Sequence, residues 1–256
     1  MNKFANGWLS ERDVRAGART RLFCLPHAGA GAAAFYRWKR ELPGIDLCPV
    51  LLPGRELRMR EESRVDAEAL ADDLAESTRA YLDAPFAIFG HSMGSLLAYE
   101  WAVRLAESGG PEPLCLFVSG RDAASLPMAY PDVHRLSDAE FVAELGRRYG
   151  GVPANMLEDA GLREVFLPIL RSDLKLVETY RHGPRAMLRC PMMAFAGIDD
   201  FSVSDAGLNA WGELTTGEFS VRRFRGDHFY SIGAGQRDLL DLLARRLGSG
   251  RNLEAE

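Results

Sequence analysis

The chain has 256 residues, of which 47% are hydrophobic, and a formal net charge of −5 at pH 7. This length and composition suit one α/β domain with a large core, and the scattering of arginines among acids excludes the basic surface of a nucleic-acid-binding protein. No apolar stretch approaches the length of a membrane span or a signal-peptide core, so we expect a protein that is neither membrane-bound nor processed.

Short apolar runs alternate with helical patterns along the chain, which indicates a parallel sheet with crossover helices. The runs are residues 21–25, 47–52, 86–89, 114–118, 192–196 and 219–224. Between the second and third runs, residues 66–82 place Leu70, Leu74 and Tyr81 near helical spacing, which predicts an amphipathic crossover helix. Leucines at similar spacing over residues 236–247 predict a last helix that packs on the sheet.

A helical insertion interrupts this alternation at residues 121–189, where no convincing strand pattern occurs. We assign residues 1–120 and 190–248 to the core of the domain and residues 249–256 to a polar tail. Ligands of open α/β sheets bind at the carboxyl ends of the strands, and an insertion after the fourth run would lie over that edge. We therefore predict a lid that encloses substrate; a peripheral helical pair that only stabilises the domain is the alternative.

Two helices are predicted within this lid. Ser137 and Glu140 fit a capping box at the start of the first helix, which the glycines beginning at Gly150 end. The second covers residues 162–180, with Pro168 as a kink or a starting point. Several apolar lid residues could line an acyl channel or pack internally, and the pattern leaves both open: Phe141, Leu157, Leu170, Leu174 and Val177.

The most informative motif is Gly90-His91-Ser92-Met93-Gly94, which lies between the third apolar run and a helix-favouring run. A G-x-S-x-G sequence at a strand-to-helix turn is typical of a nucleophile elbow, where a tight turn lifts the serine hydroxyl over the sheet edge. An ordinary strand-to-helix loop is the alternative, and the flanking strand and helix patterns favour the elbow. We therefore predict that Ser92 is a nucleophile.

A serine nucleophile needs a base within hydrogen-bond reach and a carboxylate that orients the base. In α/β-hydrolases the chain order is serine, then acid, then histidine, which restricts the base to His134, His182 or His228. His228 follows the sixth run, at the sheet edge that carries the elbow, whereas the other two fall in the lid. We therefore predict His228 as the base.

The orienting acid is expected in the loop after the fifth run. Asp199 and Asp200 compete there, and Asp205 is a weaker third candidate. Turns are rich in aspartate for ordinary hydrogen-bonding reasons, so one of the adjacent pair is a turn residue or a helix cap. Position alone does not separate the two.

An oxyanion hole needs two backbone N–H donors aimed at the developing negative charge. Met93, the residue after the nucleophile, should supply the first donor. The second should come from the loop after the first run, residues 26–31, whose small side chains let the backbone approach substrate closely.

The cysteines each lie in or beside an apolar run, at Cys24, Cys48, Cys115 and Cys190. Neither a C-x-x-C pair nor a histidine at metal-ligand spacing accompanies them. We therefore expect buried reduced thiols, no bound metal and a cytoplasmic location.

Taken together, six motifs in order resemble the stand-alone type II thioesterases that accompany polyketide synthases and non-ribosomal peptide synthetases, and the resemblance covers nearly the whole chain. The motifs are Leu25-Pro26-His27-Ala28-Gly29, Leu52-Pro53-Gly54-Arg55-Glu56, Gly90-His91-Ser92-Met93-Gly94, Leu167-Pro168-Ile169-Leu170-Arg171-Ser172-Asp173, Gly197-Ile198-Asp199-Asp200 and Gly226-Asp227-His228-Phe229. Ala30 departs from the second glycine that is common in the family's first loop.

The resemblance implies an α/β-hydrolase fold with an inserted lid. Its Gly-x-x-Asp pattern selects Asp200 over Asp199, so that Ser92, Asp200 and His228 become a catalytic triad. It also implies that the N–H of Ala28 joins that of Met93 in the oxyanion hole.

By the same resemblance, the chain is an editing thioesterase that hydrolyses acyl groups from the phosphopantetheine arm of acyl or peptidyl carrier proteins. The acyl group passes to Ser92 and water then releases it, with no cofactor of the enzyme's own, and we expect a monomer. A free-standing serine esterase or lipase acting on small oxyesters is one alternative. A non-catalytic module that only binds carrier proteins is another.

Carrier proteins are typically acidic, so four arginines after the second run are candidates for docking charges: Arg55, Arg58, Arg60 and Arg64. They alternate with Glu56, Glu61 and Glu62, and we favour a solvated surface of mixed charge for this segment.

Overall fold

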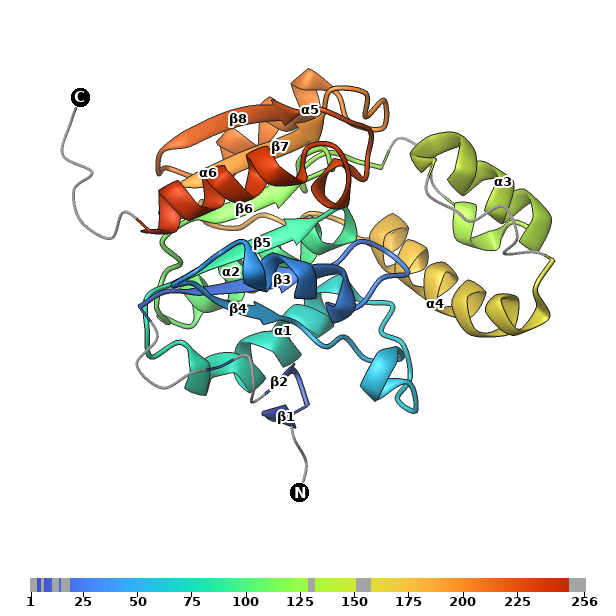
Figure 1. The fold of residues 1–256 in the computed structure, drawn as a ribbon, viewed down its shortest axis with the longest axis horizontal. Coiled ribbons are helices and arrows are strands. Elements are labelled where there is room, and N and C mark those ends of the chain that lie inside the picture. The colour runs from blue at the N-terminus through green and yellow to red at the C-terminus, as the bar shows by residue number, and fades with distance from the viewer. Residues whose placement is uncertain are drawn as a thin grey trace.

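A six-stranded sheet of parallel strands, in the order β4-β3-β5-β6-β7-β8, forms the centre of the molecule (Figure 1). The computed structural model describes residues 4–5, 7–10, 14, 19–128, 132–150 and 158–248. The strands are β3 (Arg21–Leu25), β4 (Asp46–Pro49), β5 (Phe86–His91), β6 (Leu116–Ser119), β7 (Met192–Gly197) and β8 (Phe219–Phe224). The prediction of a parallel sheet built from the six apolar runs is confirmed.

Helices cover both faces of this sheet, which is why its central strands are buried along their whole length. On one face α1 (Ala67–Thr78) and α2 (Met93–Glu107) pack against alternate strand residues such as Phe86 and Ile88. On the other face α6 (Gln236–Gly248) and the 3-10 helix η1 (Ala32–Arg40) pack against the intervening residues, such as Phe89. The sheet therefore separates two hydrophobic layers.

The predicted crossover helix and last helix are both present. Asp66 caps α1 by accepting hydrogen bonds from the N–H groups of Glu68 and Ala69, at 2.9 and 3.1 Å. Elements too short for periodicity to indicate are the paired strands β1 (Phe4–Ala5) and β2 (Leu9–Ser10), and α5 (Asp205–Asn209). Within the described residues the other 3-10 helices are η2 (Glu56–Arg58), η3 (Arg79–Tyr81), η4 (Val133–Arg135), η6 (Ala210–Leu214) and η7 (Tyr230–Ile232).

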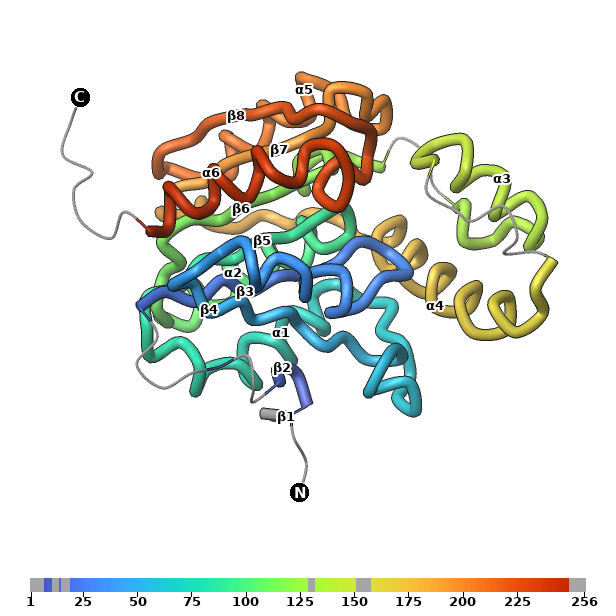
Figure 2. Tube along the Cα trace, viewed as in Figure 1, coloured from blue at the N-terminus to red at the C-terminus, as the bar shows by residue number. Residues whose placement is uncertain are grey.

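The inserted segment forms α3 (Asp138–Tyr149) and α4 (Ala160–Thr179), which lie beyond the carboxyl ends of the strands (Figure 1). Figure 2 follows the chain as it leaves β6, passes through these helices and returns to β7. The predicted capping box is present, and Pro168 lies inside α4 rather than at its start. Within the described part of residues 121–189 no strand occurs, apart from an isolated bridge of Leu188 to Thr215.

The lid has a small apolar cluster of its own, formed by Val133, Phe141, Leu145, Leu167 and Leu174. The division into a core and a lid stays a prediction, and residues 249–256, predicted as a polar tail, lie outside the described residues. Across the described ranges, no helix combines the length and the apolar character that crossing a membrane requires.

Candidate active site

Ser92 connects β5 to α2 in a strained backbone conformation, with φ 55° and ψ −114°. Such a conformation costs a side-chain-bearing residue about 1–3 kcal/mol and persists only where neighbours hold it. The N–H of Ser92 donates to the carbonyl oxygen of Ser119 at 2.7 Å. The Ser95 hydroxyl lies 2.9 Å from the carbonyl oxygen of Gly90 and 2.7 Å from that of Ser119. These bonds tie the turn to β6.

Both glycines of the motif are required by close backbone approach. A Cβ on Gly90 would lie 2.0 Å from the carbonyl oxygen of Gly94, and a Cβ on Gly94 would lie 2.1 Å from that of Leu25. The strand before Ser92 and the helix after it, on which the elbow prediction rested, are both present.

His228 and Asp200 meet at the carboxyl edge of the sheet, where they follow β8 and β7. The Nδ1 of His228 lies 2.8 Å from Oδ2 of Asp200, and the two residues are only 3% and 4% exposed. Ser202 donates to the other carboxylate oxygen from its hydroxyl at 2.5 Å and its N–H at 3.1 Å. Burial acts to raise the pKa of Asp200, but the hydrogen bonds from His228 and Ser202 outweigh it and lower the pKa. The carboxylate is therefore held ionised against the imidazole.

The three acids that the sequence left open occupy different places. Asp199 is exposed, and its N–H bonds to the carbonyl oxygen of Gly226. Asp205 lies in α5 and pairs with Arg223 at 2.7 Å. Of the three, the structure brings Asp200 to His228.

The other two candidate histidines lie away from Ser92. In the lid, His134 pairs with the buried carboxylate of Glu178 in α4, with 2.5 Å between Nδ1 and Oε2. His182 follows α4, and its Nε2 lies 3.1 Å from the hydroxyl of Tyr99 in α2. Both histidines thus connect lid residues to their surroundings.

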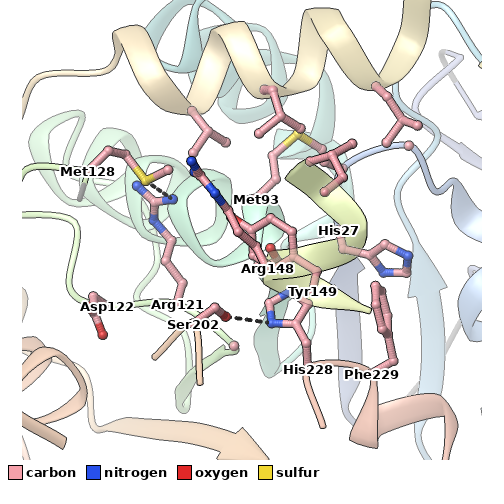
Figure 3. Close-up of a pocket in the computed structure, with 18 of the residues that line it drawn as sticks. His27, Met93, Arg121, Asp122, Met128, Arg148, Tyr149, Ser202, His228 and Phe229 are labelled. Carbon is pink, nitrogen blue, oxygen red and sulfur yellow. Dashed lines mark hydrogen bonds between the residues drawn. The ribbon is translucent and has the colours of Figure 1, made fainter. Parts of the chain in front are cut away.

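Ser92, Met93, Ala28 and His228 line one cavity of about 580 Å³, part of which is shown in Figure 3. The lid forms much of its wall, through Leu170, Leu174 and Val177 of α4 among others. Phe141 instead packs inside the lid cluster, and Leu157 lies outside the described residues. The two sets overlap, because Leu174 belongs to both, and an acyl channel through this cavity stays a prediction.

A buried ion pair holds the loop that contains Ala28. Asp173 of α4 accepts hydrogen bonds at 2.7 Å from both terminal nitrogens of Arg55, and one of its oxygens also accepts from the N–H of Gly29 at 2.7 Å. Arg55 donates further to the carbonyl oxygen of Ala30 at 3.0 Å. The pair thus joins the lid and the loop after β4 to the first loop.

This pair corrects the interpretation of Arg55 as a docking charge or a solvated residue, because Arg55 is only 5% exposed. Its neighbour Glu56 accepts the N–H groups of Ala32 and Ala33 at 2.9 Å each, at the start of η1. Neither role was predicted from the sequence. An indication of a structural role was available, since Arg55 and Asp173 each belong to a motif of the family.

A cluster of aromatic rings surrounds His228. The His91 ring lies 5.1 Å from it, the His27 ring 5.8 Å from that of His91, and Tyr149 of the lid packs 4.7 Å from His228. Burial, and secondarily the charge of His228, lowers the pKa of His27 to about 4 and that of His91 well below its ordinary value. The two histidines are therefore neutral near pH 7 and add no positive charge beside His228.

The parallel sheet, the strained serine after β5, the aspartate after β7 and the histidine after β8 define the class of protein as an α/β-hydrolase. A family model described as "Thioesterase domain" matches residues 20–247. The chain belongs to this thioesterase family.

Known relatives narrow the position of the chain within the family. It is 37% identical over 243 residues to gramicidin S biosynthesis protein GrsT of Aneurinibacillus migulanus, covering 94% of both chains. It is 40% identical over 234 residues to thioesterase PikA5 of Streptomyces venezuelae, covering 90% of this chain and 82% of that protein. The solved type II thioesterase BorB from the borrelidin biosynthetic cluster superposes with a TM-score of 0.85 at 37% identity, covering 96% of this chain and 100% of that one. The resemblance to type II thioesterases is confirmed, and with it the prediction of a serine hydrolase that cleaves thioesters.

Proposed function

We propose that this chain is an editing thioesterase, which removes acyl groups from the phosphopantetheine arm of acyl or peptidyl carrier proteins in polyketide or non-ribosomal peptide assembly. Ser92, His228 and Asp200 are its catalytic triad. The observation that carries the proposal is the Asp200–His228 hydrogen bond of 2.8 Å in the wall of the same lid-covered cavity as Ser92.

In the acylation step the hydroxyl oxygen of Ser92 attacks the thioester carbonyl carbon, and Nε2 of His228 takes the hydroxyl proton. The N–H of Nδ1 donates to Asp200, which stabilises the imidazolium that forms. The C–S bond then breaks, and His228 returns its proton to the departing thiolate of the arm. Water, activated by the same imidazole, hydrolyses the acyl enzyme and regenerates Ser92.

The developing oxyanion is stabilised by the backbone N–H groups of Met93 and Ala28. Met93 is the first residue of α2, and the first N–H groups of a helix lack partners within the helix and point out of its positive end. Ala28 lies in the loop that Asp173 holds through Gly29. Support for the pair is that both residues line the cavity beside Ser92.

The partner and the location belong to the same proposal. Relatives of similar length include a gramicidin S biosynthesis protein and a type II thioesterase of a borrelidin cluster, which supports a carrier protein as the partner. The cysteines are all buried free thiols, which supports a reducing cytoplasmic compartment. No cofactor takes part, and the expectation of a monomer stays a prediction.

The test compares an acyl-phosphopantetheinyl carrier protein with a p-nitrophenyl ester of the same acyl group at equal concentration. We expect faster hydrolysis of the carrier-bound thioester, whereas equal or slower hydrolysis would favour the free-standing esterase. Ser92→Ala should lower kcat by about 10⁴-fold or more, as in other triads. Equal turnover by wild type and Ser92→Ala would exclude serine catalysis, whereas no turnover by the wild type would leave the binding module.

A further inference from the structure

Arg121 brings a positive charge into the cavity, and the reaction described above does not use it. It follows Ser119, the last residue of β6, and β6 is hydrogen-bonded to the strand that ends beside Ser92. Its side chain extends into the lid-covered cavity toward Met128 (Figure 3). Arg121 and Ser92 therefore line the same cavity.

The guanidinium of Arg121 has poor partners among the described residues. One terminal nitrogen donates to the thioether sulfur of Met128 at 3.7 Å, and the buried Nε has no hydrogen-bond partner there. A guanidinium offers five N–H donors, and a thioether is a weak acceptor. The other arginines of the cavity wall differ, since Arg147 and Arg148 pair with Glu144 at 2.6 and 2.5 Å. Arg121 is thus the arginine of this wall whose described contacts include no carboxylate.

The described groups near Arg121 do not supply a carboxylate that pairs with its guanidinium. Burial lowers its pKa, and Tyr149, Tyr180 and Asp122 act in the opposite direction without reversing the shift. The carboxylate of Asp122 is engaged elsewhere, because it accepts from the N–H of Ser204 at 3.0 Å. Keeping a cation in such a place is unfavourable unless an anion pairs with it.

Apolar side chains make up much of the wall of the cavity that Arg121 enters: Leu126, Met128, Leu170, Leu174 and Val177. Such a cavity suits a ligand with an apolar chain and one anionic group. A carboxylate is the matching anion, because it can accept two parallel hydrogen bonds from the planar guanidinium.

From these contacts we propose that Arg121 binds the terminal carboxylate of a dicarboxylic acyl group. The substrates of this thioesterase then include acyl thioesters that end in a carboxylate, and Arg121 is a residue that determines acyl specificity. This inference rests on the proposed function. The phosphate of the pantetheine arm shares the anionic chemistry, so the substrates of the test carry no phosphate.

The test uses N-acetylcysteamine thioesters in pairs that differ by replacing the carboxylate with an isopropyl group of similar shape. The pairs are malonyl with isovaleryl, glutaryl with isoheptanoyl, and adipyl with iso-octanoyl. For each pair the ratio of kcat/KM, carboxylate over isopropyl, is measured in wild type and Arg121→Met. We expect the ratio to fall by about 10- to 100-fold for at least one pair, the loss typical of a hydrogen bond to a charged group.

Further variants separate a specific role from a structural one. Arg121→Lys keeps the charge and should retain part of the preference, and Arg37→Met, at an exposed position in η1, should leave every ratio unchanged. If Arg121→Met fails to fold, as judged by circular dichroism, Arg121→Gln takes its place. Ratios that stay within twofold of wild type in every pair overturn the proposal. A separate arm presents the same acyl pairs on coenzyme A or on a carrier protein, and a loss that appears only there would also overturn the proposal by assigning Arg121 to the phosphate.

Binding measurements keep this proposal distinct from the proposed function. In a Ser92→Ala background, calorimetry with the glutaryl and adipyl thioesters should show weaker binding when Arg121→Met is added, by a similar factor. A wild type that hydrolyses no thioester would refute the proposed function, while this binding difference would still support the role of Arg121. Equal binding by the two variants would refute that role.

Discussion

Substitutions in the buried pair of Arg55 and Asp173 should show how much the pair contributes to stability and how much to catalysis. Asp173→Ala removes two hydrogen bonds of 2.7 Å from Arg55 and the bond of 2.7 Å from the N–H of Gly29. Both charged side chains are nearly inaccessible, at 6% and 2% exposure, so the guanidinium left behind is buried and unpaired. Removing one partner of such a pair costs about 3–5 kcal/mol of unfolding free energy.

The assay is urea unfolding followed by circular dichroism, with the linear extrapolation compared between wild type and variant. Asp73→Ala is the matched control, because it removes an aspartate whose pair with Arg64 at 2.7 Å is exposed. An exposed pair contributes about 0–1 kcal/mol. If Asp173→Ala loses no more unfolding free energy than Asp73→Ala, the reasoning about the buried pair is wrong.

A double variant separates the two consequences of the pair. Arg55→Met with Asp173→Leu removes both charges, and replacing a buried pair by apolar side chains is often nearly neutral for stability. The N–H of Gly29 nevertheless stays without its acceptor, so the loop that carries Ala28 is held less firmly. We expect stability near wild type and kcat lower by up to about 100-fold, the scale of losing one oxyanion donor. A kcat equal to that of wild type would show that the Arg55–Asp173 pair does not position the loop that carries Ala28.

Two further predictions concern the elbow and the histidine cluster. Gly94→Ala places a Cβ 2.1 Å from the carbonyl oxygen of Leu25, so we expect a loss of about 1–3 kcal/mol of unfolding free energy, measured in urea, and a lower kcat. The control is Gly146→Ala in α3, which has open space around the new methyl group and should be neutral or stabilising. Equal effects of the two substitutions would contradict the steric argument. The pKa of His27 is lowered to about 4 in the folded protein, so the unfolded chain binds the proton first. Its contribution to stability is therefore complete above about pH 6.5 and declines by about 3 kcal/mol as the pH falls to about 4. His27→Gln should flatten this part of the plot of unfolding free energy against pH, and an unchanged slope would argue against a neutral His27 in the folded protein.

Much of the fold could be predicted because its causes are local. A parallel strand covered on both faces is buried along its whole length, so the apolar runs at 21–25 and 86–89 fall in β3 and β5. The nucleophile elbow could be predicted as well, because backbone contacts at Gly90 and Gly94 leave no room for a side chain and so require the glycines of the motif. Two-residue strands such as Phe4–Ala5 carry no periodicity, and these were missed.

The acid beside His228 shows where local information ends. Asp199 and Asp200 follow the same strand, and nothing in the turn itself distinguishes them. One is exposed, while the other lies buried against an imidazole 28 residues further along the chain. The resemblance to a family supplied the choice that position did not.

The sequence by itself determined the sheet and the elbow, because each depends on residues that are near one another in the chain. It also placed candidate acids and a histidine after later strands, in that chain order. Only the tertiary structure showed what surrounds Arg55 and Arg121. Arg55 reaches its partner Asp173 across 118 residues, and the surroundings of Arg121 are assembled from the loop after β6 and from the lid. A charge has the same pattern in a sequence whether it is solvated or buried. Its partners, and therefore its energy, are set by packing between distant segments.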